Sequence, residues 1–307
     1  MSILEVKDLS IAFNQYTTGL KQETIKVISN LSVALEEGEI LAVVGASGSG
    51  KSLLAHAILG ILPNNANVSG TIAYNGEALT AKRQSALRGT EIALIPQSVN
   101  YLDPLMRVGK QVRTSAREGD AVVSQRAVFE RFHLQPDVER MFPFQLSGGM
   151  ARRTLLSTAI VSGAKVIIAD EPTPGLDPAV MREALSNFRE FADQGCAVML
   201  ITHDIESALT IADKIAVFYA GTTVEIAPVE DFTGNGEALR HPYSKALWRA
   251  LPQNDFIPIP GSQPRPDHLP PGCLFAPRCP LATHTCDQAQ PEMRNLRDGV
   301  VRCIHAT

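Results

Sequence analysis

The segment Gly45-Ala-Ser-Gly-Ser-Gly-Lys-Ser52 has the residue types and the spacing that bind phosphate groups. It fits the pattern G-x-x-x-x-G-K-[ST], in which backbone N–H groups of a glycine-rich turn point at phosphate oxygens. Lys51 would reach the β- and γ-phosphates of a nucleotide, and Ser52 would coordinate Mg²⁺. An ordinary glycine turn is the alternative, but it would not require a strand before it and a helix after it. The candidate phosphate-binding residues are Gly45, Ser47, Gly48, Ser49, Gly50, Lys51 and Ser52.

A pair of carboxylates, Asp170 and Glu171, follows the apolar run of residues 166–169. Open α/β sheets bind ligands at the carboxyl ends of their strands. Asp170 would hold Mg²⁺, directly or through water, and Glu171 would orient or deprotonate an attacking water. A solvated strand end is the common alternative, but the pair lies about 120 residues after a phosphate-binding loop. Since phosphoryl transfer needs mainly a Lys, Mg²⁺ and an oriented water, the two segments together predict this chemistry.

A third group of chemically active residues is formed by four of the five cysteines. They lack the close C-x2-C pairs of common zinc fingers and of bacterial two-cluster ferredoxins, so their spacing alone does not name a metal. Four thiolates can hold Zn²⁺ or a [4Fe–4S] cluster, and reduced structural thiols are a third interpretation. His284 and His305 are possible substitute ligands, whereas Cys196 is expected to be a small core residue. The four cysteines are Cys273, Cys279, Cys286 and Cys303.

The elements predicted around these residues form an α/β fold with a parallel, doubly wound sheet. The expected strands are residues 4–13, 25–35, 39–44, 165–170 and 197–202. The expected helices are residues 52–62, ending at Pro63, and residues 178–194. Residues 100–161 are mostly helical in pattern and are interpreted as an inserted helical subdomain. This arrangement places the phosphate-binding loop and Asp170 at the same edge of the sheet.

Composition limits the classes of protein to which the chain can belong. Its 307 residues suggest about two domains, and 45% apolar with 20% charged residues describes a folded chain. The 28 basic and 32 acidic residues give a net charge of −4, which offers no long-range attraction for nucleic acid or an anionic membrane. The N-terminal segment lacks a signal-peptide pattern, and no apolar run approaches the ~18 residues of a membrane span. We therefore expect a cytosolic chain whose cysteines are not structural disulfides.

The composition changes after about Pro228. Ten of the 20 prolines lie between Pro252 and Pro291. Because proline lacks an N–H donor and has a fixed φ, long helices and central strands are not expected there. We predict an irregular C-terminal extension.

The segment Leu146-Ser-Gly-Gly-Met150 resembles the signature sequence of ATP-binding cassette (ABC) proteins. Further cassette motifs follow in the expected order, so the resemblance covers roughly residues 3–225. Residues 95–97 are similar to the glutamine loop, residues 175–177 to the loop after the catalytic carboxylate, and residues 201–204 to the switch histidine. The resemblance implies a P-loop ABC ATPase with a RecA-like core, an antiparallel β-subdomain and a helical subdomain.

This resemblance also implies roles for individual residues. Two cassettes would close head to tail, so that Ser147 and Gly149 of one chain cap the ATP held by the partner. Gln97 would link Mg²⁺ and the attacking water to a membrane partner, and His203 would hold the γ-phosphate. Other residues carried over from the family are the adenine-stacking Phe13, the nucleotide-site Asp177 and the catalytic set Glu171, His203, Gln97 and Lys51. Without the resemblance, His203 and Phe13 would each be read as core residues.

Two departures from the family pattern accompany the resemblance. Met150 replaces the commonest Gln and is reminiscent of nickel-type importer subunits, and Pro174-Gly175 replaces small and hydroxyl residues. Neither removes a catalytic group, so the chain's own site is expected to hydrolyse ATP.

Residues 101–111 resemble a segment that receives short permease helices in dipeptide, oligopeptide and nickel importer ATPases; a helix starting at Pro104 is the alternative. Residues 241–247 and the cysteine-containing tail are similar to the C-terminal extension of the same group. The implied boundaries are a nucleotide-binding domain at residues 1–228, with a helical subdomain at about 100–161, and an extension at 229–307. The resemblance favours a [4Fe–4S] cluster over Zn²⁺ at the four cysteines.

The sequence thus predicts an ATPase subunit of an importer for short peptides or nickel or another metal chelate. Its implied partners are a related second ATPase, two permeases and an extracytoplasmic substrate-binding protein, with the chain held at the cytoplasmic face of the membrane by the permeases. A soluble cassette ATPase of translation or DNA repair is the alternative, as is a zinc-bound nucleic-acid module, which the acidic charge disfavours. The transported substrate is not encoded in a chain that would never contact it.

Overall fold

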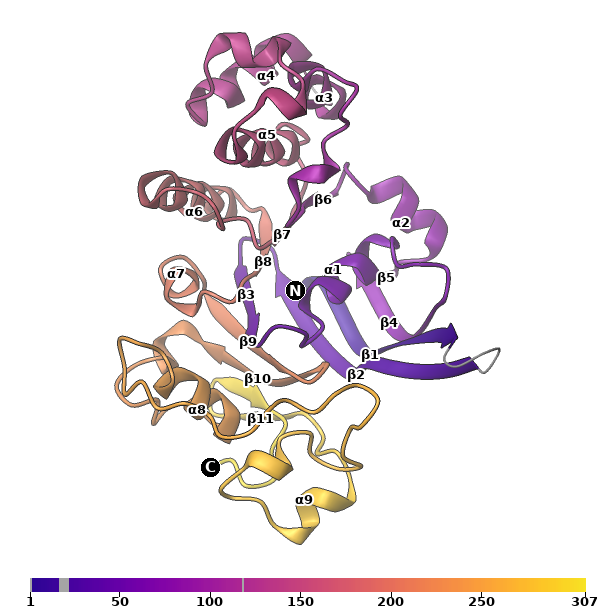
Figure 1. Cartoon of the computed structure of the whole chain (residues 1–307), viewed down its shortest axis with the longest axis vertical. Coiled ribbons are helices and arrows are strands. Elements are labelled where there is room, and N and C mark those ends of the chain that lie inside the picture. Colours follow the sequence, from indigo (N-terminus) through magenta and orange to yellow (C-terminus); the bar gives the residue numbers. More distant parts are fainter. Residues whose placement is uncertain (1, 17–21, 118) are drawn as a thin grey trace.

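The computed structural model describes residues 2–16, 22–117 and 119–307 as two β-sheets with helices and a C-terminal extension (Figure 1). A helical group lies at one end of the molecule, the sheets lie in the middle, and the extension lies at the other end. The expected α/β class is confirmed. Within these ranges, no helix combines the length and the apolar composition required to cross a bilayer.

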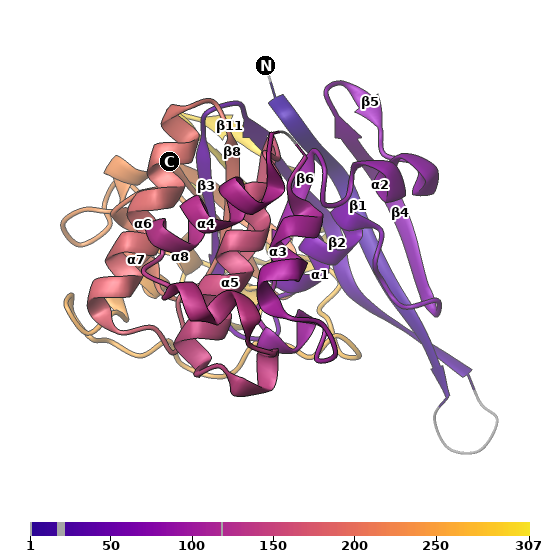
Figure 2. The same ribbon diagram turned by 90° about the horizontal axis from the view of Figure 1, so that it is seen from above.

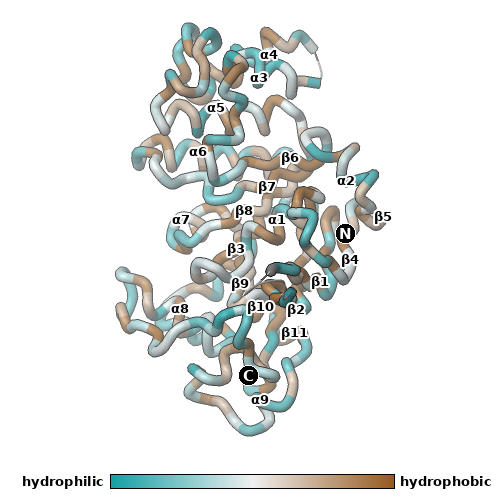
Figure 3. The backbone as a smooth tube through the Cα atoms, turned by 45° about the vertical axis from the view of Figure 1, so that its right-hand side comes forward, coloured by the Kyte–Doolittle hydropathy of each residue, from teal (hydrophilic) through white to brown (hydrophobic). Residues whose placement is uncertain are grey.

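The larger sheet has the strand order β11-β12-β10-β9-β3-β8-β7-β6. Strands β9, β3, β8, β7 and β6 are parallel, as expected, but β10, β12 and β11 are antiparallel. The parallel strands β3, β7 and β8 are buried along their whole length, which explains their continuous apolar sequence (Figure 3). The strands are β3 (Ile40–Gly45), β6 (Ile92–Ile95), β7 (Val166–Asp170), β8 (Ala197–Ile201), β9 (Lys214–Tyr219), β10 (Thr222–Pro228), β11 (Arg294–Leu296) and β12 (Gly299–Val301).

The smaller sheet is antiparallel, with the order β2-β1-β4-β5. Its strands are β1 (Ser2–Tyr16), β2 (Gln22–Glu36), β4 (Ala66–Tyr74) and β5 (Glu77–Ala78). Apolar residues of β1 and β2 pack with α1 (Lys51–Leu59) against one face of the larger sheet. The first two strands were expected, whereas β4, β5, α2 (Ala81–Leu87) and β6 of the larger sheet were not. Strand β4 is mostly exposed and has no clear apolar alternation, so its sequence does not indicate a strand.

Helices cover the other face of the larger sheet (Figure 2). The helical subdomain contains α3 (Val108–Ser115), α4 (Ala121–Arg131) and α5 (Gly148–Val161), and it is followed by α6 (Pro178–Asp193) and α7 (Ile205–Leu209). Short 3₁₀ helices lie at Val99–Tyr101, Pro136–Arg140, Pro143–Gln145, Val229–Asp231 and Ala276–Arg278. The helical interpretation of residues 100–161 is therefore correct in outline.

One expected helix end is wrong, and the alternative of a helix starting at Pro104 is not observed. The first helix stops at Gly60, three residues before Pro63, because Gly60 adopts a left-handed conformation with φ +64°. A Cβ atom there would lie 2.4 Å from Oε1 of Gln84, so any other residue would combine a strained φ with a displaced Gln84 side chain. Pro104 does not begin a helix, since α3 starts at Val108.

The C-terminal extension is more ordered than an irregular segment. It contains α8 (Pro242–Arg249) and α9 (His284–Gln288), and its β12 pairs with β10 of the main sheet. Arg302 donates hydrogen bonds to the backbone oxygens of Asn30, at 2.7 Å, and Thr223, at 3.1 Å. The extension is thus built onto both sheets, because the free edge of β10 accepts a further strand.

Candidate active site

The loop between β3 and α1 lines a cleft of about 560 Å³. The predicted residues Gln97, Glu171 and His203 line the same cleft, and Val27 of β2 also contributes. Val27, Gln97, Glu171 and His203 come from four segments of the sequence that are separate from one another and from the loop. The structure therefore brings the phosphate-binding loop and the predicted catalytic groups to one place.

Two glycines are required by the shape of the loop. Gly45 has φ +154°, and a Cβ atom there would lie 2.3 Å from the backbone oxygen of Phe218. Gly50, with φ +93°, precedes α1 and leaves the first N–H groups of the helix without a side-chain cap. Such free N–H groups at a helix N-terminus favour an anion. The hydroxyl of Ser49 is buried without a hydrogen-bond partner in the described structure.

Lys51 lies inside the cleft. Its Nζ donates to the backbone oxygens of Gly45, at 2.8 Å, and Ala46, at 3.2 Å. Burial lowers its pKa, while the nearby charges of Glu171 and Asp170 oppose this shift. A phosphate group would supply further negative charge next to the ammonium group, which is the interaction predicted from the sequence.

Asp170 has the surroundings expected of a Mg²⁺ ligand. Its carboxyl is buried, and Oδ1 has no hydrogen-bond partner among the described residues. Burial raises the pKa of Asp170, and a hydrogen bond with Ser52 lowers it. A buried carboxylate oxygen beside a hydroxyl oxygen fits the preference of Mg²⁺ for oxygen ligands. The residues present therefore suit the metal.

Glu171 and His203 are in direct contact. Nδ1 of His203 lies 2.9 Å from both carboxylate oxygens of Glu171. Glu171 has φ +48°, a conformation that is uncommon for a residue with a side chain. Its side chain is only 10% exposed, whereas that of His203 is 69% exposed. The structure thus provides a buried carboxylate held by an imidazole that faces the cleft.

Arg152 of α5 is a site residue that sequence reasoning missed. Its Nη1 donates to the backbone oxygens of Pro96 and Glu171, both at 3.2 Å. The side chain is buried, which lowers its pKa, and the charge of Glu171 opposes the shift. The sequence signal that could have identified Arg152 is an Arg on the face of a helix that otherwise packs into the core. Arg152 fastens the helical subdomain to the glutamine loop and to the strained Glu171 backbone.

Besides Gly45 and Asp170, which contact the lining residues Lys51 and Ser52, four predicted nucleotide-binding residues are absent from the lining of this cleft. Phe13 is half-buried on β1 and packs against the apolar core between the sheets. Ser147 and Asp177 accept backbone hydrogen bonds at the starts of α5 and α6, and Gly149 lies in the first turn of α5. None of them lines the cleft formed by this chain.

The four tail cysteines are free thiols that line one small cavity. Burial raises the pKa of Cys273, and charges on Cys303 and Cys286 would raise it further, so these groups are near one another. Within residues 2–16, 22–117 and 119–307, however, no three His, Cys, Asp or Glu side chains are grouped so that they could hold a metal ion. The sulfur of Cys196 lies elsewhere, and burial raises its pKa to about 11, as suits the predicted core residue.

Family comparisons agree with these features. The ABC transporter family model matches residues 28–174, and the model of the oligopeptide/dipeptide transporter C-terminal region matches residues 224–286. A dimeric ATP-binding cassette solved in a post-hydrolysis state with ADP and phosphate has a TM-score of 0.65. The alignment covers 74% of this chain and 98% of that chain at 23% identity, which shows that the fold is shared.

Whole-chain relatives extend the comparison. The oligopeptide transport ATP-binding protein OppD of Mycobacterium tuberculosis is 36% identical over 98% of this chain, which spans about half (52%) of that relative's length. OppD of Salmonella typhimurium is 33% identical over 94% of this chain and 89% of its own length. With this identity along nearly its whole length, the chain belongs to the ABC transporter family of ATP-binding proteins.

Proposed function

We propose that the chain is the ATP-hydrolysing subunit of a membrane importer for short peptides. The observation that supports this proposal most strongly is the cleft beside the phosphate-binding loop, which is lined by Lys51, Gln97, Glu171 and His203. The family match at residues 224–286 and the peptide-transport names of its relatives support peptides as the cargo class. Those names give no support to nickel.

Hydrolysis would proceed by attack of a water on the γ-phosphorus. Glu171 accepts the water's proton as the new oxygen–phosphorus bond forms, the bond to the β-phosphate oxygen breaks, and ADP leaves. Lys51 neutralises charge on the phosphates, and His203 orients Glu171 or the γ-phosphate. Ser52, Asp170 and Gln97 would hold Mg²⁺, which neutralises phosphate charge when bound. Phe13 would stack on adenine.

The start of α5 supports a head-to-tail pair of cassettes. A Cβ atom on Gly148 or Gly149 would meet nothing within 4 Å in the described chain. Glycine destabilises a helix by about 1 kcal/mol relative to Ala, so neither residue is explained by this chain's own packing. A close approach by a partner's nucleotide explains both, with Ser147 and the free N–H groups of α5 binding its phosphates. Asp177 would lie near the same interface.

The predicted permease contact is supported by an exposed apolar surface. Leu105 is 87% exposed and Phe144 is 76% exposed. The two segments are joined because the guanidinium of Arg107 lies 5.1 Å from the ring centre of Phe142, which stacks on Phe144. We propose that permease helices dock here and hold the chain at the cytoplasmic face of the membrane.

Purification of the chain from its native membrane tests this function. We expect it to co-purify with two polytopic permeases and a second, related ATPase, and the reconstituted complex to hydrolyse ATP faster when a peptide-loaded binding protein is added. Recovery without permeases would contradict the proposal and would favour a soluble cassette ATPase.

The cysteine cavity supports a second proposal, a structural or redox-sensing [4Fe–4S] cluster bound by Cys273, Cys279, Cys286 and Cys303. Among the described residues no three ligand side chains are grouped to hold a metal ion, so this proposal rests on the cavity that the four cysteines share. His241 lines the same cavity; burial lowers its pKa to about 3, so the ring is neutral. Its Nδ1 accepts a hydrogen bond from Tyr243, which places the proton on Nε2, and buried Nε2 has no partner there. A thiolate or sulfide sulfur would accept a hydrogen bond from that N–H.

Iron analysis of an anaerobically purified sample checks this proposal. We expect about four iron atoms per chain with broad visible absorbance, and loss of both in Cys286→Ser. Cys196→Ser is the matched control and should retain the iron. Zinc in place of iron, or no metal at all, would contradict the cluster.

The contacts of Arg152 lead to a separate prediction. Arg152→Gln removes the guanidinium that spans Pro96 and Glu171, so kcat for ATP should fall by about tenfold while KM changes less than twofold. Arg131→Gln is the matched control, because Arg131 of the helical subdomain donates to Asn187 and Glu190 on α6, away from the cleft. Equal kcat values in the two variants would show that Arg152 does not position Glu171.

A further inference from the structure

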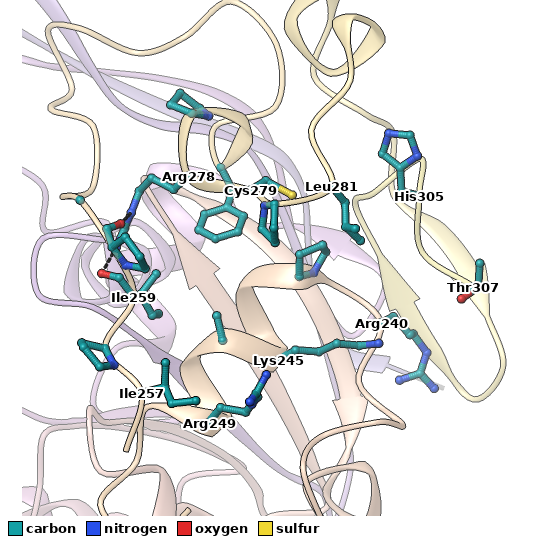
Figure 4. Close-up of a pocket in the computed structure, with 18 residues that line it drawn as sticks. Arg240, Lys245, Arg249, Ile257, Ile259, Arg278, Cys279, Leu281, His305 and Thr307 are labelled. Atoms are coloured by element: carbon teal, nitrogen blue, oxygen red, sulfur yellow. Dashed lines mark hydrogen bonds between the residues drawn. The ribbon is translucent and has the colours of Figure 1, made fainter. Parts of the chain in front are cut away.

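A second cleft, of about 720 Å³, lies in the C-terminal extension (Figure 4). One of its walls is α8, whose residues Pro242, Lys245, Ala246 and Arg249 all line the cleft. Their spacing of three and four places them on one face of the helix. The other walls are residues 257–261 and 277–281. The volume is within the range of about 300–1,000 Å³ that is usual for small-molecule sites.

The charge of this cleft is one-sided. Arg240, Lys245, Arg249, Arg278 and His305 contribute to its lining, which contains no Asp or Glu among the described residues. Two of these cations form ion pairs with carboxylates that do not line the cleft. Arg240 pairs with Glu225 and Asp231, and Arg249 pairs with Asp255.

The other two strong cations have no carboxylate partner. Arg278 donates to the backbone oxygens of Pro260 and Ile259 and to the hydroxyl of Tyr219, all of which are uncharged. The side chain of Lys245 makes no hydrogen bond or ion pair in the part of the chain that the structure describes, and Figure 4 shows it extended along the cleft. The cleft therefore has unneutralised positive charge.

Most of the remaining lining is apolar, with Thr307 as a polar exception. It includes Ile257, Ile259, Phe275 and Leu281, of which Ile257 is 48% and Leu281 is 54% exposed. A ligand that satisfies both features has an anionic head and an apolar body. A zwitterion fits less well, since its ammonium group would find no side-chain carboxylate in the lining.

A chain of contacts joins this cleft to the phosphate-binding loop. Nη1 of Arg278 donates to the Tyr219 hydroxyl at 3.2 Å, and the rings of Tyr219 and Tyr243 are 4.5 Å apart. The Tyr243 hydroxyl lies close to the backbone of Ala46, inside the loop. Because both tyrosines are buried, a movement of the Arg278 side chain can be transmitted to the nucleotide site through packed side chains.

We propose that this cleft binds a small amphipathic anion, with a carboxylate or phosphate head on an apolar body, and that this binding changes the affinity of the loop for nucleotide. The inference requires nucleotide binding by the loop but not peptide as the cargo. It can therefore fail while the transport function holds, and the reverse is also true.

Binding is tested on the full chain with four probes that share an octyl body: octanoate, octyl phosphate, octanamide and octylammonium. Calorimetry, or the fluorescence of Trp248 on α8, reports binding. We expect at least one anion to bind about tenfold more tightly than octanamide or octylammonium, and the preferred anion identifies the head group. Lys245→Gln should lower the affinity for that anion by about fivefold or more, and the control Lys82→Gln, at an exposed position, should leave it unchanged. Equal affinities for all four probes, or no effect of Lys245→Gln in a folded chain, would overturn the site.

The link to the loop is tested by titrating a non-hydrolysable ATP analogue with Mg²⁺, with and without the preferred anion. We expect the anion to change nucleotide affinity by about fivefold or more, with the reciprocal effect on its own binding. Tyr219→Phe should keep anion binding but lose this effect, whereas Tyr74→Phe, whose hydroxyl contacts Glu91, should keep both. An unchanged nucleotide affinity in the presence of bound anion would overturn the link.

Discussion

Glu171→Gln is expected to bind ATP normally and to hydrolyse it at least about a hundredfold more slowly. The amide is nearly the same size as the carboxylate and can still hydrogen bond to Nδ1 of His203, so the geometry of the cleft should survive. It cannot accept the proton of the attacking water. The reason for the loss is therefore chemical, and the free energy of unfolding should change little.

The measurement is steady-state ATP turnover of the assembled transporter, together with nucleotide affinity and thermal unfolding of the isolated chain. Glu130→Gln, on the exposed surface of α4, is the matched control and should have normal turnover. A normal rate in Glu171→Gln would remove Glu171 from the role of base. Weakened ATP binding by the variant would assign it a part in binding instead.

Gly149→Asp is expected to abolish nearly all turnover, a loss of about a hundredfold, without weakening the chain's own ATP binding. A Cβ atom added at Gly149 would meet nothing within 4 Å in the described chain, and a carboxylate in the first turn of a helix is electrostatically favourable. The fold should therefore be kept. The carboxylate would repel the phosphates of a nucleotide carried by the partner.

Comparison with Gly149→Asn separates charge from bulk. The asparagine variant fills nearly the same space without charge and should lose less activity than the aspartate variant. Turnover is measured in the assembled complex, and ATP binding is measured on the isolated chain. If Gly149→Asp retains turnover, the start of α5 does not cap a phosphate. If it loses its own ATP binding, the head-to-tail arrangement is contradicted.

Local sequence patterns predicted the parts of the site that are continuous in the chain. The loop at Gly45–Ser52 was recognised because a tight turn with positive φ between a buried strand and a helix restricts its residue types strongly. The carboxylates Asp170 and Glu171 were predicted because they end a wholly buried strand. By contrast, β4 and the three-residue strands β11 and β12 were missed, since exposed or very short strands bury too little to show a period of two.

Residue types and spacing thus predicted the kind of chemistry: phosphate binding, carboxylate-assisted water attack and a thiol-rich tail. Which groups meet depends on the tertiary structure. It joined Glu171 to His203, placed Arg152 across two backbone oxygens, and connected Tyr243 of the extension to Ala46 in the loop. These contacts join residues that are far apart in the chain. A hydrogen bond of about 3 Å depends on how packed elements fit together, and local propensity and periodicity do not record that fit.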